Sequence, residues 1–189
     1  MLRVLLDVLA EVGSDHALIG EIAVGHHARP RAALDVELLV PRRRIGGITE
    51  ALASRGYVIR PHMHLVRVYA AGSDPARDDS IADLVEREAS PTLLEAARST
   101  EIATVLGHEV CVVQRGALVA LKFQAAVSPT RSVLDRQQDV IDMGRVIGRS
   151  WSDADEELAL RLADTMFAGA RDELARMIGD HRAGRPVRI

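Results

Sequence analysis

The sequence has few of the residues on which several common kinds of site depend. The chain has 189 residues, and Cys111 is its only cysteine. A single cysteine excludes an internal disulfide and a zinc site built from cysteines, and it fits a reducing compartment. Aromatic residues make up only 3% of the chain. That is too few for the stacking surfaces that bind single-stranded nucleic acid.

Charge of neither sign dominates. The chain carries 24 basic and 27 acidic residues, for a net charge of −3, and Lys122 is its only lysine. No basic field therefore indicates nucleic-acid binding. Long uncharged apolar runs are also missing, and the first twelve residues include Arg3, Asp7 and Glu11. We therefore expect neither a membrane span nor a signal peptide, and we predict a cytoplasmic protein with no membrane partner.

What the sequence does contain is periodic apolar segments. Hydrophobic residues make up 48% of the chain, enough for one globular core, with or without a helical appendage. Strand and helix patterns alternate up to residue 114, and only helical patterns follow. We predict an α/β (α+β) fold. A small mixed sheet flanked by helices would occupy residues 1–114, and a C-terminal helical bundle packed on it would occupy residues 115–189.

The segment 31–40, RAALDVELLV, places two acids among branched aliphatic residues. In a strand, Asp35 and Glu37 lie on one face, and Val36 and Leu38 face a core on the other. Neighbouring carboxylates repel each other unless a cation or open water lies between them. The pair fits a Mg²⁺ site for phosphoryl chemistry, or an edge strand with a solvated acidic face. Taken alone, the segment favours the edge strand.

Other segments carry polar residues at informative positions. Asp83 lies inside the apolar strand pattern 81–85, where a lone buried carboxylate is costly. Lys122 lies in a helical pattern at 115–127, and Asp139 and Asp142 are three apart on one face of the next helix. Solvent exposure explains most such acidic pairs, and a role in orienting Lys122 is the alternative.

These motifs, in their order, are similar to those of a known family. They are Leu18-Ile19-Gly20-Glu21, Arg31-Ala32-Ala33-Leu34-Asp35-Val36-Glu37, Ile81-Ala82-Asp83-Leu84-Val85, Leu118-Val119-Ala120-Leu121-Lys122 and Arg136-Gln137-Gln138-Asp139-Val140-Ile141-Asp142-Met143. The order resembles the nucleotidyltransferase superfamily with the DNA polymerase β-like core. Within it, the sequence resembles the minimal and abortive-infection toxin (AbiEii-like) branch.

The resemblance implies an activity and roles for single residues. It implies Mg²⁺-dependent transfer of a nucleoside monophosphate from an NTP to a hydroxyl on tRNA, protein or a small molecule. The chain would then be the toxin of a toxin–antitoxin pair, with an antitoxin or a second copy as partner. The implied catalytic and metal-binding residues, holding two Mg²⁺ ions, are Asp35, Glu37 and Asp83. The implied nucleotide-binding residues are Gly20, Glu21, Arg31, Lys122 and Asp139.

Three positions depart from the family pattern. Glu21 stands where the family has Gly or Ser, Ala33 replaces Thr, and Glu37 replaces Asp. The extra methylene of Glu37 moves its carboxylate, which matters where metal geometry is strict. The alternative to an active enzyme is therefore a catalytically degenerate binding or regulatory protein on the same fold.

The histidines suggest a different alternative. His26 and His27 follow the first predicted turn, and His62 and His64 lie on one face of a predicted strand. Together these four imidazoles would bind zinc or nickel if the fold brings them together.

Overall fold

The computed structural model describes residues 1–29, 35–73, 79–148 and 150–187. The helices are α1 (Leu2–Glu11), α2 (Gly20–His27), α3 (Arg42–Ser54), α4 (Pro91–Arg98), α5 (Arg115–Ala126), α6 (Val133–Ile147), α7 (Asp153–Ala163) and α8 (Ala170–Arg182), with a 3-10 turn, η1, at Arg87–Ala89. The strands are β1 (Ala17–Ile19), β2 (Val36–Val40), β3 (Val58–His62), β4 (Leu65–Tyr69), β5 (Ala82–Glu86), β6 (Thr100–Val105) and β7 (His108–Val113).

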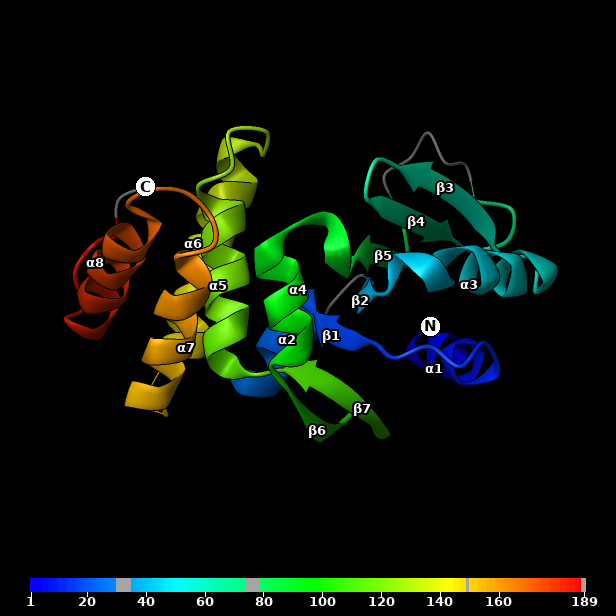
Figure 1. The fold of residues 1–189 in the computed structure, drawn as a ribbon, viewed down its shortest axis with the longest axis horizontal. Coiled ribbons are helices and arrows are strands. Elements are labelled where there is room, and N and C mark those ends of the chain that lie inside the picture. The colour runs from blue at the N-terminus through cyan, green and yellow to red at the C-terminus, as the bar shows by residue number, and fades with distance from the viewer. Residues whose placement is uncertain (30–34, 74–78, 149, 188–189) are drawn as a thin grey trace.

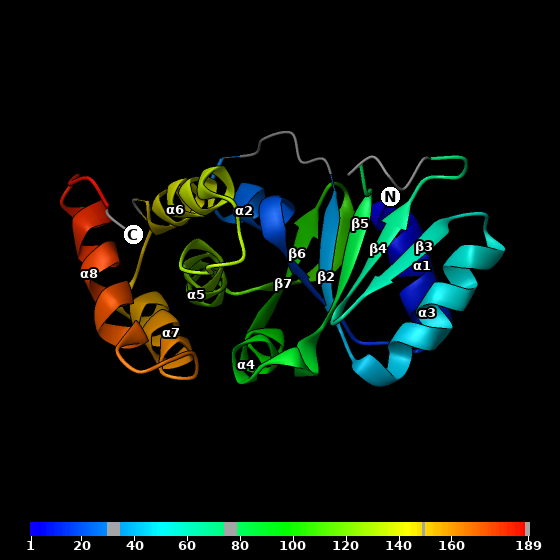
Figure 2. The ribbon, with the colours of Figure 1, turned by 90° about the horizontal axis from the view of Figure 1, so that it is seen from above.

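The strands form one mixed sheet in the order β3-β4-β5-β2-β1-β7-β6. Strand β2 runs parallel to β5 and antiparallel to β1, and β1 runs parallel to β7. Helices α1 and α3 cover one face of the sheet, and α2, α4 and α5 lie on the other (Figures 1 and 2). Helices α6, α7 and α8 lie beyond α5, away from the sheet. The predicted mixed α/β fold, with flanking helices and further helices towards the C-terminus, is confirmed.

Strand β2 lies in the middle of the sheet, so the interpretation of its segment as an edge strand is wrong. Val36, Leu38, Leu39 and Val40 are all buried. Apolar residues on both faces of a strand are typical of a central position, because both faces must then be covered. Glu37 is the one polar residue of β2, and it is half-buried.

Two features near the edges of the elements have local physical causes. Pro61 lies inside β3 opposite Val66. Strand β3 is at the edge of the sheet, where a residue without an N–H is tolerated. Helix α3 begins at Arg42. The Arg42 backbone N–H donates to Glu88 at 2.9 Å, and this negative charge suits a helix N-terminus.

Close backbone contact joins α5 to the later helices. Gly116, in the first turn of α5, lies so near α7 that a Cβ there would overlap the backbone oxygen of Asp155. The α7 N-terminus that approaches it is fixed by a capping box between Ser152 and Asp155. Apolar residues of α5 to α8 belong to the same buried cluster as those of the sheet.

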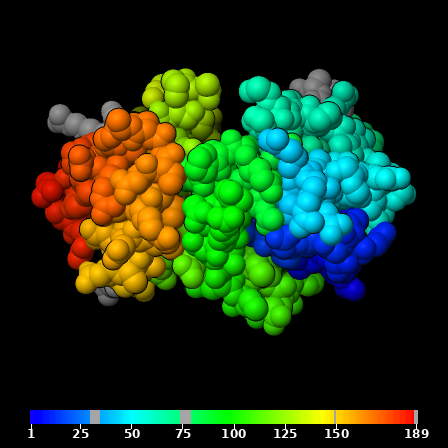
Figure 3. Space-filling model, viewed as in Figure 1, coloured from blue at the N-terminus to red at the C-terminus, as the bar shows by residue number. Residues whose placement is uncertain are grey.

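The molecule is elongated, with the sheet at one end and α6 to α8 at the other (Figure 3). It is hollowed at its upper edge in this view, between the α5–α6 region and the β3–β4 hairpin. Over the described residues, no helix combines the length and the apolar character that a membrane span requires.

Two Gly→Ala substitutions test the close contact between α5 and α7 at Gly116. Gly116→Ala forces α5 and α7 apart, so we expect it to lower the free energy of unfolding by about 1–3 kcal/mol. Gly179 lies in α8 with nothing within 4 Å of an added Cβ. Gly179→Ala should therefore stabilise the protein by about 0.5–1 kcal/mol, since alanine favours the helix. Chemical denaturation measures both, and equal stability of the two variants would contradict the contact.

Candidate active site

Two of the predicted carboxylates lie side by side on the central strands. Glu37 of β2 is in register with Asp83 of β5 on one side and with Ile19 of β1 on the other. Residues in register on neighbouring strands point to the same face of the sheet. Asp35 precedes Glu37 by two residues, just before β2 begins. The structure thus brings Asp35, Glu37 and Asp83 together where β2 and β5 start.

The pKa of Glu37 reflects this crowding. Burial raises the pKa of its carboxyl to about 7, Lys122 opposes the rise, and the negative charges of Asp35 and Asp83 add to it. A carboxylate so placed is near the midpoint of its titration at neutral pH. Negative charge is therefore concentrated at this point of the sheet.

Gly20 forms the floor of the site. It follows β1, opens α2, and has a φ of +69°, which favours glycine. A Cβ at this position would overlap the carboxylate of Glu37. The Glu37 carboxylate therefore lies against the backbone at the N-terminus of α2. Backbone N–H groups and the helix dipole make such a terminus a favourable place for an anion.

Lys122 of α5 supplies the positive charge. Its Nζ donates to Oδ1 of Asp139 at 3.0 Å and lies 3.4 Å from Oδ2 of Asp142. Burial favours a lower Lys122 pKa, but the charges of Asp139, Glu37 and Asp142 more than offset it, and the net shift is upward. Asp139 and Asp142 are both buried on α6. Their interpretation as a solvated acidic pair is wrong, and their contact with Lys122 supports the alternative of an orienting role.

Two arginines at the site were missed by the sequence reasoning. Arg131 places its Nε 3.2 Å from Oδ2 of Asp139, and its charge is among those that lower the pKa of Glu37. Arg67 stands opposite Asp83 in the β4–β5 register. In the sequence, Arg131 lies in a short segment between two helical patterns. The residue that faces Arg67 depends on which strands pair. Neither residue has a local sequence signal.

A cavity of about 490 Å³ opens beside this cluster. Its lining includes Gly20, Glu37, Lys122, Arg131 and Asp139, together with residues of α4, α5 and the α5–α6 connection. The polar groups of the cavity therefore come from both the sheet and the helical part of the chain.

Of three further residues that the resemblance singles out, the structure describes only Glu21. Glu21 lies half-buried in the first turn of α2, and the lining formed by the described residues includes its neighbour Gly20 but not Glu21. Arg31 and Ala33 fall outside the described residues, so their predicted roles stay predictions.

The fold does not gather the four histidines. His62 lies on β3 and His64 beside β4, at one edge of the sheet. His26 and His27 lie at the end of α2, near Glu101 of β6 at the other edge. A single metal site using all four imidazoles is therefore wrong.

Comparison with known proteins finds this arrangement of strands and helices in solved structures. No family model matches the sequence, and no curated protein is detectably similar to it. The solution structure of the antibiotic-resistance factor ANT(2'')-Ia superposes with a TM-score of 0.58 at 15% identity, covering 96% of this chain and 95% of that one. The fold is a nucleotidyltransferase fold.

Two further solved structures share it. The lincomycin-bound lincosamide antibiotic adenylyltransferase LnuA has a TM-score of 0.51 at 11% identity, over 77% of this chain and 95% of LnuA. An antigenic nucleotidyltransferase-like protein from Paracoccidioides brasiliensis has a TM-score of 0.54 at 16% identity, over 94% and 91% of the two chains. The resemblance to the nucleotidyltransferase superfamily is thus confirmed at the level of the fold.

The raised pKa of Glu37 predicts a pH-dependent stability. Between pH 4.5 and about 7 the native Glu37 holds a proton that the unfolded chain releases, so its ionisation lowers stability as the pH rises through this window. Glu37→Gln removes that effect. In buffer with a chelator, we expect its unfolding free energy relative to the parent to rise by on the order of 2 kcal/mol from pH 5 to pH 8.

Glu50→Gln, at an exposed position on α3, serves as the matched control and should show no such trend. Denaturant titrations at several pH values measure both variants. A Glu37→Gln difference that is flat with pH would contradict the crowded carboxylate site.

Proposed function

We propose that the protein is a nucleotidyltransferase that moves a nucleoside monophosphate from an NTP to a hydroxyl group of a small molecule. The observation that carries the proposal is the register of Glu37 with Asp83, beside the Gly20 turn. It supports the predicted catalytic and metal-binding roles of Asp35, Glu37 and Asp83. The fold shared with ANT(2'')-Ia and LnuA supports the reaction class.

The donor chemistry of the three carboxylates suits a divalent metal, but their oxygens are not gathered into a ligand group in the structure: among the described residues, only the ligand atoms of His26, His27 and Glu101 are. All three offer hard oxygen ligands, and the charges of Asp35 and Asp83 raise the pKa of Glu37, so a cation among them relieves their repulsion. We therefore assign Asp35, Glu37 and Asp83 as the residues that hold Mg²⁺. When bound, Mg²⁺ supplies charge neutralisation on the phosphates and a lowered pKa of the attacking hydroxyl.

The other residues bind and orient the substrates. Backbone N–H groups at the Gly20 turn bind phosphate oxygens, as helix N-termini do. Lys122, oriented by Asp139 and Asp142, and Arg131, held by Asp139, face the triphosphate. The acceptor oxygen forms a bond to the α-phosphorus, and the bond from that phosphorus to pyrophosphate breaks. Pyrophosphate leaves with the electron pair, and a site carboxylate, in our assignment Asp83, takes the hydroxyl proton.

The acceptor is proposed from the cavity and the shared fold. The names of two fold neighbours refer to antibiotics: one is an antibiotic-resistance factor and the other a lincosamide antibiotic adenylyltransferase. A cavity of about 490 Å³ lies beside the carboxylates, and a pocket of this size suits small-molecule ligands. A tRNA or protein acceptor, as in the abortive-infection toxin branch with its antitoxin, is the alternative that the experiment below separates.

A degenerate binding protein is the second candidate, and one contact favours it. The Glu37 carboxylate lies on the Gly20 backbone, where this proposal places phosphate oxygens. In a competent enzyme the Glu37 side chain rotates away when the NTP binds. In a degenerate one it stays and excludes the triphosphate. Glu37→Asp shortens the side chain by one methylene, so it withdraws the carboxylate from Gly20 and separates the two cases.

The activity predicts labelling that depends on the carboxylates. The protein is incubated with each α-³²P-labelled NTP, Mg²⁺ and three acceptor pools: small polyhydroxylated amines, total tRNA, and cell-extract protein. We expect label in the small-molecule pool. Asp35→Asn and Asp83→Asn should each lower the rate by roughly 100-fold or more, since they remove a metal ligand.

Asp7→Asn is the matched control, because Asp7 is exposed on α1, on the other face of the sheet. Its rate should equal that of the parent. Label in tRNA or protein alone would replace the small-molecule acceptor with the toxin-type one. Activity that survives Asp83→Asn would overturn the site. Activity that appears only in Glu37→Asp would establish the degenerate alternative.

A further inference from the structure

A second cluster of metal-ligating side chains lies outside the carboxylate site. His26 and His27 end α2, and Glu101 lies on the edge strand β6. Each offers one ligand atom, and these three atoms lie within 4.8 Å of one another. Nε2 of His26 is 3.4 Å from Oε1 of Glu101. The two imidazole rings have centroids 4.8 Å apart and meet edge to face.

The surrounding backbone fixes one of the two rings. Nε2 of His27 is 2.7 Å from the carbonyl oxygen of Val113 at the end of β7, so this nitrogen donates and Nδ1 keeps its lone pair. Metal-binding histidines commonly donate their second nitrogen to a backbone carbonyl in this way, which fixes the tautomer and the orientation of the ring. His27 is only 9% exposed, so its position is set by packing.

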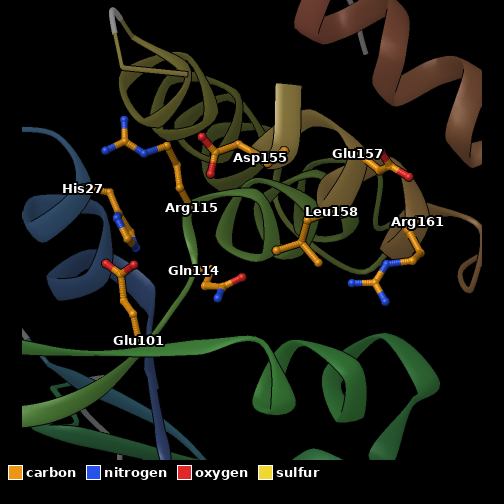
Figure 4. Close-up of a pocket in the computed structure, with 9 residues that line it drawn as sticks. His27, Glu101, Gln114, Arg115, Asp155, Glu157, Leu158 and Arg161 are labelled. Carbon is orange, nitrogen blue, oxygen red and sulfur yellow. The ribbon is translucent and has the colours of Figure 1, made fainter. Parts of the chain in front are cut away.

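His27 and Glu101 line another cavity of about 490 Å³, together with residues at the start of α5 and on α7. Figure 4 shows His27 and Glu101 directed towards each other, whereas the Arg115 guanidinium points away from Glu101. Asp155 and Glu157 of α7 line the same cavity and balance Arg115 and Arg161. Burial is the main cause of the lowered pKa of His27, and the charge of Arg115 adds to it whereas that of Glu101 opposes it. A bound cation would therefore depend on the Glu101 carboxylate to offset Arg115.

We propose that His26, His27 and Glu101 form a zinc-class metal site that links the C-terminal end of α2 to the edge strand β6. Two imidazoles and one carboxylate select a transition metal over Mg²⁺. Ligand atoms of one zinc ion are roughly 3–3.5 Å apart. The oxygen of Glu101 is already 3.4 Å from His26, and the side chain is 48% exposed, so it has room to adjust to a metal ion. Solvent in the cavity completes the coordination.

Zinc binding in the presence of excess Mg²⁺ tests this site, because the Mg²⁺ occupies the carboxylates of the nucleotidyltransferase site. Zn²⁺ is titrated into the full-length protein in competition with a chromophoric chelator. We expect one Zn²⁺ per chain. His26→Ala and Glu101→Gln should each weaken Zn²⁺ binding by roughly 10-fold or more. Zn²⁺ should also raise the Tm of the parent and not that of these two variants.

Matched controls use the same residue types away from the cluster. His62→Ala removes an exposed histidine at the opposite edge of the sheet, and Glu109→Gln removes an exposed glutamate on β7. Both should bind Zn²⁺ as the parent does. Asp83→Asn should also keep the site, so the result is independent of nucleotidyl transfer. No Zn²⁺ binding by the parent, or unchanged binding in both His26→Ala and Glu101→Gln, would overturn the proposal.

Discussion

The concentration of carboxylates at the start of β2 is the constraint on which the candidate site depends. Glu37 is half-buried on the central strand β2, and it lies between Asp83 in the β2–β5 register and the backbone of Gly20. Like charges held this close need a counter-charge. Lys122 provides one from the helical side, and Asp139 and Asp142 hold it in place from α6.

This constraint connects the two parts of the chain. The strands bring Asp35, Glu37, Asp83 and the Gly20 turn to one end of β2 and β5, and α5 carries Lys122 over the same face of the sheet. The close approach of α5 and α7 at Gly116 fixes α5 in turn. Because the cavity takes its lining from the sheet and from the helices, relative movement of these parts changes its shape.

Local patterns in the sequence predicted much of the framework. The apolar pattern of residues 36–40 predicted a strand, and the structure contains it as β2. The resemblance indicated the fold. It also named residues that the structure brings together around Glu37. The catalytic and binding roles of all these residues stay predictions. Sequence patterns correctly predicted the features that depend on a single helix or strand.

The remaining features depend on pairings between distant segments. Strand order decides whether β2 is central: the apolar residues on both faces of the segment favour a central position, but the acidic pair favours an edge. Arg67 faces Asp83 only through the β4–β5 register, and His26 meets Glu101 across 75 positions of sequence. The contact between Glu37 and Gly20 joins β2 to the end of β1. Only the folded chain reveals this contact.

A crystal structure with Mn²⁺ and a non-hydrolysable NTP analogue tests the central claim most directly. Mn²⁺ replaces Mg²⁺ at oxygen ligands and is located by its anomalous signal. The account predicts manganese bound by Asp35, Glu37 and Asp83, the triphosphate at the Gly20 turn, and the Glu37 side chain moved off the Gly20 backbone. Manganese and nucleotide bound elsewhere, with Glu37 still against Gly20, would contradict it.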